Sequence, residues 1–595
     1  MADTQDSQVI ALRNFTILLL MWLLVIFSCI YFTGLFLMFL IHGFETLKQI
    51  VYLSFSDQVL TSVLTIKQVW ASFLNNRSSV TLTNYNYFLP KMLIGSFLPI
   101  SIYGVLVIVF KDFLLTWKPF QEEESKHGTA HWATPSEVQK AGLRKKRGLL
   151  LGKYKGKFLV VDDYQHILLF APTGSGKGVG FVIPNLLFWD QSVIVHDVKL
   201  ENYELTSGYR FHKLKQKVFV WNPAEQEGYT HCYNPFDWIA RDIGKIVDDV
   251  QKMTNNLLPA AGGAQDFWKA EARALMAGIM LYLLTDKNKI ASLGELLRML
   301  RSDDVAYNLA VVLDTMGEQL HPVGYMNLAA FLQKADKERS GVTSTASSSL
   351  DLWANPIVDS ATAKSHFNVG MFKRTPHTLY VGVAPNNIVR LKPLLQIFYQ
   401  QISGIFTKKL PDLGTEKYGV LMMLDEFPTL GKLSQIQSGI AFFRGYRVKL
   451  FLIIQDTEQL KSLYKESGMN SFLSNSTYRI TFSANNTQTA KLISDLLGNK
   501  TVINESYSRS KYLDLNPGDR KVSISKASRA LLLPQEVINL PRDEEILLIE
   551  AQAPIRCNKI FYYKEKIFNG RLLNKTKIPK QEPYIPKNQK PTKRD

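Results

Sequence analysis

One glycine-rich turn constrains the fold of this chain more than any other feature. It reads Ala171-Pro172-Thr173-Gly174-Ser175-Gly176-Lys177-Gly178 and continues into Val179. The apolar run 166–170 before it predicts a β-strand, and the run 179–187 after it predicts the start of a buried helix. In such strand–turn–helix units, backbone N–H groups point at phosphates and the helix N-terminus favours negative charge. The sequence therefore predicts that residues 171–179 bind the phosphates of ATP, with Lys177 reaching the β- and γ-phosphates.

This turn departs from the usual phosphate-binding pattern at two positions. Ala171 stands where the first glycine is expected, and Gly178 stands where a Ser or Thr hydroxyl normally binds Mg²⁺. A glycine-rich turn can also occur for packing alone, and this alternative stays open. The missing hydroxyl weakens an inference about metal affinity more than the inference about the nucleotide.

A second motif complements the turn. The apolar run 418–424 predicts another buried strand, and it ends in Asp425 and Glu426. Ligands of parallel sheets bind at the carboxyl ends of the strands. We therefore expect Asp425 to hold Mg²⁺ and Glu426 to activate the attacking water, as in metal-assisted phosphoryl transfer. Two acids after a strand can also be surface charges.

Composition narrows the class of protein. The chain has 595 residues, a net charge of +18 and only three cysteines, which are too few and too scattered for a disulfide framework or a zinc site. A reducing compartment is the simplest inference. Residues 140–157 contain eight basic residues and no acid, and residues 575–595 contain seven basic and two acidic residues. These clusters are either solvated segments or, for the first, a surface attracted to anionic lipid.

Two uncharged segments predict membrane spans. Residues 15–41 are long enough for one transmembrane helix, and residues 92–110 form a second apolar run between Lys91 and Lys111. The first run is too long for the apolar region of a signal peptide. Because an ATP site must face the cytoplasm, we expect residues 1–14 and everything after residue 110 to lie inside. The loop 42–91 would then lie outside, in the periplasm.

The rest of the chain predicts an α/β protein. Strand-like runs separated by helical stretches favour a mostly parallel sheet; they lie at 192–196, 217–221, 377–384, 420–424, 449–454 and 478–482. Residues 243–345 lack a convincing strand and have helical periodicity, which predicts an all-helical insertion in the sheet. From residue 574 to 595 the composition is Lys- and Pro-rich without periodicity, which predicts a disordered basic tail.

Taken together, these segments resemble the type IV secretion coupling proteins, in particular their TraG-like branch. The resemblance covers nearly the whole chain and rests on the block 171–187, on 424–431 with its Asp-Glu-Phe-Pro-Thr-Leu-Gly sequence, and on Tyr-Asn-Pro-Phe-Asp at 233–237. One departure is the block 197–201. It reads Asp-Val-Lys-Leu-Glu where the family usually has Asp-Pro-Lys-Gly-Glu, so the turn residues after that strand are lost.

The resemblance implies a RecA-like P-loop NTPase domain at 111–242 and 346–573, interrupted by the all-helical domain and preceded by two transmembrane helices. It also implies an ATPase that works as a homo-hexamer in a bacterial inner membrane. Such a motor brings secreted protein substrates or relaxase-bound DNA to the components of a type IV secretion channel. Two further residues look similar to family positions: Gln455 as a sensor of the γ-phosphate, and Arg444, with Arg447 as its rival, as a residue that reaches a neighbouring subunit's ATP.

Two other functions remain open at this point. The chain could be a docking receptor whose nucleotide site is structural and hydrolyses little ATP, an alternative that the missing hydroxyl at Gly178 sustains. It could also be a DNA pump of the chromosome-segregation type, although such pumps usually have more spans and a folded DNA-reading domain at the C-terminus. Whether the cargo is protein or DNA is not determined by the sequence.

Overall fold

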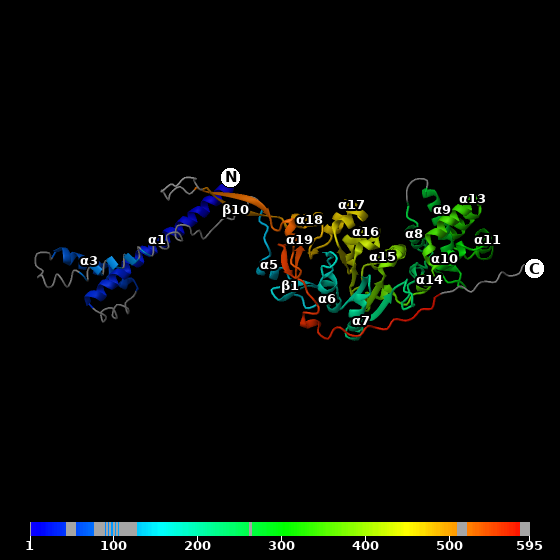
Figure 1. Cartoon of the computed structure of the whole chain (residues 1–595), viewed down its shortest axis with the longest axis horizontal. Coiled ribbons are helices and arrows are strands. Elements are labelled where there is room, and N and C mark those ends of the chain that lie inside the picture. Colours follow the sequence, from blue (N-terminus) through cyan, green and yellow to red (C-terminus); the bar gives the residue numbers. More distant parts are fainter. Residues whose placement is uncertain are drawn as a thin grey trace, which may run out of the picture. The chain divides into compact units, whose positions relative to one another are not determined.

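The computed structural model describes residues 2–42, 55–75, 128–260, 265–508 and 521–583, together with positions 90, 93, 94, 97, 98, 101, 102 and 105. The chain divides into two compact units, Met1–Ser125 and Lys126–Asp595 (Figure 1). The glycine-rich turn and every predicted strand belong to the second unit.

Among the described residues of the first unit, one helix is long and apolar enough to cross a membrane. Helix α1 (Ala2–His42) includes Trp22–Leu40, a stretch of 19 residues with a mean hydropathy of 2.5. It overlaps the first predicted span. Among the described residues, no second helix is both long and apolar enough to cross a membrane. The predicted second span, 92–110, lies mostly outside the described residues.

The segment predicted as a periplasmic loop, 42–91, is partly helical. Helix α3 (Phe55–Asn75) lies within it and packs against α1. A Cβ atom on Gly34 would lie 2.4 Å from Cβ of Ser62, so only a glycine permits this approach of the two helices. Beside it, the Tyr31 hydroxyl donates a hydrogen bond of 2.5 Å to Oε1 of Gln58. Close contacts at small residues are common where helices pack in membranes.

The second unit is built around one sheet of eleven strands, in the order β2-β1-β13-β12-β9-β3-β8-β7-β4-β6-β5. The seven strands from β9 to β5 are parallel, which confirms the predicted α/β class. They are β3 (Ile167–Phe170), β4 (Ser192–Asp197), β5 (Lys217–Trp221), β6 (His377–Gly382), β7 (Val420–Leu424), β8 (Val448–Ile454) and β9 (Tyr478–Thr481).

Four antiparallel strands, which were not predicted from the sequence, extend this sheet beyond β9. They are β1 (Leu149–Tyr154), β2 (Lys157–Val161), β12 (Glu544–Ile549) and β13 (Ile555–Asn558). A separate two-stranded ribbon consists of β10 (Asn499–Ser508) and β11 (Lys521–Ala530). Its base is attached to residues 128–130, because Ala130 N donates to Asn499 O at 3.0 Å.

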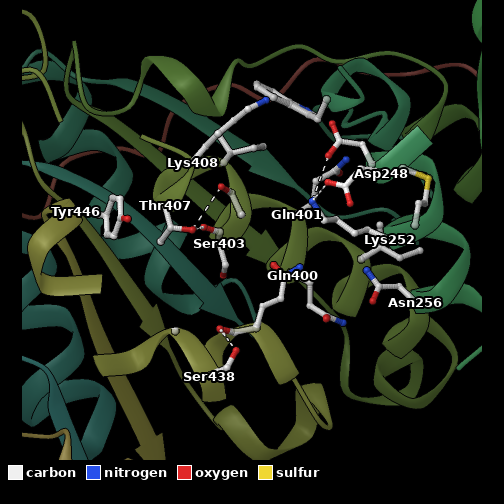
Figure 2. Close-up of a pocket in the computed structure, with 18 of the residues that line it drawn as sticks. Asp248, Lys252, Asn256, Gln400, Gln401, Ser403, Thr407, Lys408, Ser438 and Tyr446 are labelled. Atoms are coloured by element: carbon white, nitrogen blue, oxygen red, sulfur yellow. Dashed lines mark hydrogen bonds and ion pairs between the residues drawn. The ribbon is translucent and has the colours of Figure 1, made fainter. Parts of the chain in front are cut away.

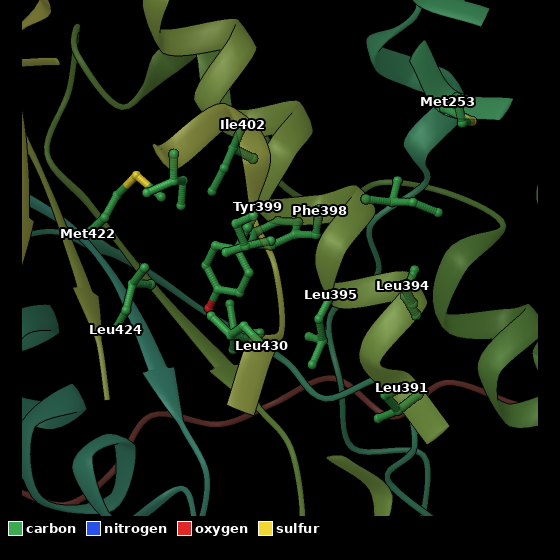
Figure 3. Packing of buried hydrophobic residues seen from close by; sticks show 14 of the residues in the cluster. Met253, Leu391, Leu394, Leu395, Phe398, Tyr399, Ile402, Met422, Leu424 and Leu430 are labelled. Atoms are coloured by element: carbon green, nitrogen blue, oxygen red, sulfur yellow. The ribbon is translucent and has the colours of Figure 1, made fainter. Parts of the chain in front are cut away.

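Apolar side chains cover both faces of the sheet. Leu168 and Phe170 belong to one buried cluster, and Ile167 and Leu169 belong to the other, because successive side chains of a strand point to opposite faces. On the first face, α15 (Ile388–Thr407) packs its leucines and Phe398 near β7 (Figure 3). The other helices around the sheet are α5 (Pro135–Lys140), α6 (Ile183–Phe188), α7 (Glu201–His212), α16 (Ser434–Phe443), α17 (Thr457–Ser474), α18 (Thr487–Leu497) and α19 (Pro534–Ile538).

The described residues between β5 and β6 contain helices and no strand, as the sequence predicts for 243–345. The helices continue past residue 345, and they form the green end of the second unit in Figure 1. They are α8 (Ile246–Leu257), α9 (Gln265–Thr285), α10 (Leu293–Leu300), α11 (Val305–Met316), α12 (Pro322–Leu332), α13 (Asp336–Ser349) and α14 (Pro356–Thr362). The side chain of Asn234 ties the entry of this insertion together, donating to Ala291 O at 2.8 Å and accepting from Phe236 N.

Part of the expected disordered tail is ordered in the structure. Residues 574–583 follow the surface of α7 and reach the loop at Gly228, as the red segment of Figure 1 shows. Thr576 accepts a short hydrogen bond from the Tyr203 hydroxyl, and Gln581 N donates to Gly228 O at 2.7 Å. Backbone hydrogen bonds and the partly buried side chain of Ile578 hold this segment, and its Lys- and Pro-rich composition does not predict this order. The remaining residues, 584–595, lie outside the described part.

Candidate nucleotide-binding site

The glycine-rich turn joins β3 to the start of a helix, as predicted. It leads from Phe170 into a π-helical turn at Gly178–Val182 and then into α6. Gly174 and Gly176 have φ angles of +78° and +85°, a conformation that other residues rarely adopt. A Cβ atom on Gly174 would meet nothing within 4 Å, so this position needs the backbone freedom of glycine rather than its small size.

The side chains of three predicted site residues meet beside this turn. Nζ of Lys177 lies 2.8 Å from Oδ1 of Asp425 and 2.9 Å from Oε1 of Glu426. Burial disfavours the charged form of Lys177, but the two carboxylates outweigh this effect and raise its pKa. Burial also raises the pKa of Asp425, against the opposing pull of Lys177. The arrangement concentrates one cation and two carboxylates where the turn meets the end of β7.

Glu426 has an unusual backbone conformation. Its φ and ψ are +54° and +48°, in the left-handed region, which costs a residue with a side chain about 1 kcal/mol. The turn is held by Thr429, whose backbone N and hydroxyl both donate to Glu426 O, at 2.9 and 2.8 Å. Strain held in place by surrounding structure is common at functional sites. Here it accompanies the pairing of the Glu426 carboxylate with Lys177.

Two buried polar residues on β4 lie near these carboxylates, and one of them, His196, was not predicted from the sequence as a site residue. His196 is the register partner of Leu424, and Asp197 follows it. Burial lowers the pKa of His196 to about 4 and raises the pKa of Asp197 to about 7. Asp197 accepts hydrogen bonds from Tyr203 N at 2.8 Å and from Asn202, so it fixes the start of α7. A histidine in a predicted strand that is otherwise mostly apolar could have indicated that His196 lies near the site.

The turn after β4 forms although the family's turn residues are absent. Leu200 adopts φ +58°, where the family pattern has glycine. Its side chain packs against Gly382 on β6, at which a Cβ atom would lie 2.8 Å from Leu200 Cδ2. The left-handed conformation of Leu200 costs about 1 kcal/mol, and the packing of its side chain against Gly382 offsets this cost.

The other predicted residues, Gln455 and Arg444, lie at opposite ends of the strands. Gln455 directly follows Ile454, whose carbonyl accepts a hydrogen bond from Ala171 N at 2.9 Å. Gln455 therefore lies at the same end of the strands as the glycine-rich turn. Arg444 precedes β8 and donates to Gln165 before β3. The seven residues of β8 span about 23 Å, so Arg444 lies far from Lys177 of its own chain.

Arg447 lies at the same end of the strands as Arg444 and is held there by hydrogen bonds to its own chain. Its Nε and Nη2 donate to the Tyr164 hydroxyl at 3.2 and 3.0 Å, and Nη1 donates to Glu416 O at 3.1 Å. Arg444 is exposed, whereas Arg447 is only half-exposed. Of the two rivals, Arg444 is the more exposed, and its hydrogen bond to Gln165 is longer, at 3.4 Å, than those that hold Arg447.

The residues around the turn fit a triphosphate and a metal ion. The Ser175 hydroxyl, within the turn, is buried and has no hydrogen-bond partner in the described part of the chain. Thr481, the register partner of Phe170, has a buried hydroxyl of the same kind. A phosphate would give such groups partners, and Asp425 with its neighbouring carboxylate supplies the oxygen ligands that Mg²⁺ prefers.

A groove of about 760 Å³ lies elsewhere, between α8, α15 and α16. Figure 2 shows its lining, which includes Asp248, Lys252, Gln401, Ser403 and Tyr446. None of residues 171–179 lines it. It therefore belongs to the junction between the helical insertion and the sheet, not to the nucleotide-binding site.

Sequence comparison relates the chain to two curated bacterial proteins. It is 31% identical over 492 residues to Protein VirD4 of Rhizobium rhizogenes, which covers 80% of this chain and 71% of that protein. It is 29% identical over 525 residues to the conjugal transfer protein TraG of Escherichia coli, which covers 79% of this chain and 82% of that protein.

The fold has solved counterparts. The bacterial conjugative coupling protein TrwBdeltaN70 superposes with a TM-score of 0.55 at 15% sequence identity, over 74% of this chain and 96% of that one. TrwB in complex with the ATP analogue ADPNP gives a TM-score of 0.54 at 15% identity, over 74% of this chain and 95% of that one. The sequence profile of the family described as Type IV secretory system Conjugative DNA transfer matches residues 131–584. With most of its length matched, the chain belongs to this family, the coupling proteins of type IV secretion.

Proposed function

We propose that this coupling protein binds and hydrolyses ATP with Mg²⁺ at residues 171–179, and that hydrolysis drives transfer of its cargo. The observation that carries the proposal is the position of Lys177, between Asp425 and Glu426 and beside a turn with two left-handed glycines. The solved complexes of TrwB with ADPNP, and with ADP and Mg²⁺, support it by analogy of fold.

The roles of the site residues follow from their charges. Lys177 neutralises the β- and γ-phosphates, and the backbone of the turn supplies N–H donors. Bound Mg²⁺ would supply charge stabilisation for the transferred phosphoryl group, and Asp425 would hold it. Glu426 accepts a proton from the attacking water. Because Lys177 contacts Glu426 at 2.9 Å, phosphate binding has to draw the ammonium away before Glu426 can act as a base.

We infer two further roles. Gln455, beside Ala171 at the same edge of the sheet, senses the γ-phosphate with its amide. Arg444 acts on the ATP of a neighbouring subunit, because β8 separates it from its own site. This placement supports a homo-hexamer in which each site is completed by the next subunit. An arginine supplied in this way raises the hydrolysis rate by about 10³–10⁵ in other NTPases.

We propose that the protein is anchored in a bacterial inner membrane by the spans 15–41 and 92–110, with the second unit in the cytoplasm. There it recruits secreted protein substrates or relaxase-bound DNA to the secretion channel. Protease added to spheroplasts should then cut only within 43–91. Cleavage within 575–595 would reverse this topology.

The test of the ATPase proposal is phosphate release by the purified full-length protein. Wild type should release phosphate only with Mg²⁺, and Lys177→Ala should abolish this release. Lys213→Ala, which removes an exposed lysine at the end of α7, is the matched control. The missing hydroxyl at Gly178 favours one alternative, a docking receptor with a structural nucleotide site. Wild type that binds ATP but releases no phosphate, with or without cargo, would establish that alternative.

A further inference from the structure

A lysine from the antiparallel extension reaches the glycine-rich turn. Lys559 follows β13 and is only 4% exposed. Its Nζ donates to Ser175 O at 3.1 Å and lies 4.1 Å from the centre of the Phe482 ring. The sequence alone indicates no role for this lysine, because 384 residues separate it from Ser175.

The residues after Lys559 hold the same turn. The Phe561 ring lies 3.7 Å from where a Cβ atom on Gly176 would be, and Tyr562 N donates to Val179 O at 3.2 Å. Residues 559–562, which we call the clasp, thus contact the turn at three successive points. The sequence did not predict that residues next to an antiparallel strand would contact the glycine-rich turn.

Electrostatics make the position of Lys559 unusual. Among the described residues, no carboxylate forms an ion pair with its ammonium group, although buried cations are costly unless paired. Burial lowers the pKa of Lys559 to about 8, opposed by the more distant Glu545 and Asp543. Glu545 is itself buried, burial raises its pKa well above its usual range, and it forms no ion pair with Lys559 in the described part of the chain. A cation is therefore kept one carbonyl group away from the predicted phosphates.

The geometry of the peptide bond explains how the contact between Lys559 and Ser175 O orients the turn. In a trans peptide the C=O and the following N–H point in opposite directions. A cation that holds Ser175 O on the clasp side therefore directs Gly176 N–H toward the other side. Polarisation of the carbonyl also strengthens that N–H as a donor, because linked hydrogen bonds reinforce one another.

We propose that Lys559 is a positioning residue for the phosphate-binding turn, which holds the Ser175 carbonyl so that the following N–H meets the phosphates of a nucleoside diphosphate or triphosphate. The inference rests on the proposed nucleotide site. Lys559 does not touch the reacting atoms; it acts through the backbone of the turn and adds positive charge behind it.

The test compares ADP binding by full-length variants, measured by calorimetry with Mg²⁺. Lys559→Met removes the charge and the donor but keeps an apolar stem over Phe482. It should weaken ADP binding about tenfold, which corresponds to about 1.4 kcal/mol. Lys559→Arg keeps both charge and donor and should bind within about threefold of wild type. Lys575→Met, an exposed lysine paired with Glu204, is the control and should bind like wild type.

The outcomes separate this inference from the nucleotide site itself. If wild type binds no ADP, the proposed function fails. If wild type and Lys559→Met bind ADP equally, the positioning role is overturned and the nucleotide site stands. If Lys559→Met lowers the unfolding temperature without ligand, Phe561→Ala decides, because it loosens the clasp without removing the buried cation. It should weaken ADP binding with an unchanged unfolding temperature, and wild-type affinity would overturn the proposal.

Discussion

Lys177 donates a hydrogen bond of 2.9 Å to Glu426, although 249 residues separate them in the sequence. The contact links the glycine-rich turn after β3 to the end of β7, two strands that are not neighbours because β8 lies between them. The lysine can serve the carboxylates or a phosphate, but not both fully. At the proposed site, nucleotide binding would therefore be coupled to the release of Glu426, and the first prediction depends on this competition.

Substitutions of Lys177 and Glu426 should affect ATP binding and hydrolysis differently. Lys177→Ala removes the partner of the phosphates and should weaken ATP binding and abolish hydrolysis. Glu426→Gln keeps Lys177 and the turn, so it should bind ATP at least as tightly as wild type while hydrolysis falls by at least about 100-fold. Binding by a fluorescent ATP analogue and phosphate release measure the two effects. A Glu426→Gln variant that binds no nucleotide would show that Glu426 has a structural role instead.

Gly178 offers a gain-of-function test. A Cβ atom at this position would meet nothing within 4 Å, so Gly178→Ser should fold without strain. The added hydroxyl stands where other phosphate-binding turns bind Mg²⁺. We expect half-maximal phosphate release at a Mg²⁺ concentration lower by about threefold or more. Gly178→Ala, which adds the carbon without the oxygen, is the control. Equal Mg²⁺ requirements of the Ser and Ala variants would place the metal elsewhere.

Most of the parallel strands could be predicted because they are buried on both faces and form continuous apolar runs in the sequence. The runs at 192–196 and 420–424 agree with β4 and β7 to within one residue. The antiparallel strands β1 and β13 could not be predicted in this way. β1 includes Gly152 and ends in half-buried residues, and β13 alternates buried and exposed positions over only four residues.

The sequence singles out Lys177, Asp425 and Glu426, whose side chains meet in the structure, but it does not predict the geometry of the site. Lys177, Asp425 and Glu426 stand out because each follows an apolar run at the edge of a parallel sheet. The left-handed conformations of Leu200 and Glu426 have no signature, because nothing in a leucine or glutamate favours them. The contact of Lys559 with Ser175 depends on the strand order, which only the fold determines.

Arg210 should be essential for stability. It is fully buried on α7, and its N–H groups donate five hydrogen bonds, at 2.6 to 2.9 Å. The acceptors are the carbonyls of Leu186, Trp189 and Gln191 and the side chains of Thr378 and Gln216. Arg210→Lys keeps the charge but leaves most of these acceptors unpaired, and it should cost about 3 kcal/mol of unfolding free energy.

Thermal unfolding of the purified protein measures this loss. Arg241→Lys is the matched control, because that arginine is exposed and makes a single hydrogen bond of 3.4 Å to Leu284 O. An Arg210→Lys variant as stable as the Arg241→Lys variant would show that the buried network does not stabilise the end of α6.

His166 should make the protein sensitive to acid. Its Nδ1 accepts from Leu450 N at 3.1 Å, and its Nε2 donates to Ile440 O at 2.7 Å, so the buried ring fits only in its neutral form. Burial lowers its pKa from 6.5 to about 4. The unfolded chain binds the proton first, so this contribution is present above pH 6.5 and is lost as the pH falls toward 4. The loss amounts to about 3 kcal/mol.

The measurement is the unfolding free energy between pH 7 and pH 4. His166→Gln cannot titrate, and its amide can both donate and accept. Its stability should therefore fall less steeply than that of wild type over this range, even if it is lower at pH 7. His212→Gln replaces an exposed histidine and should follow the wild-type curve. His196 and His231, whose pKa values burial also lowers to about 4, leave a residual slope in every variant. Parallel curves for wild type and His166→Gln would mean that the His166 ring accepts a proton in the folded protein.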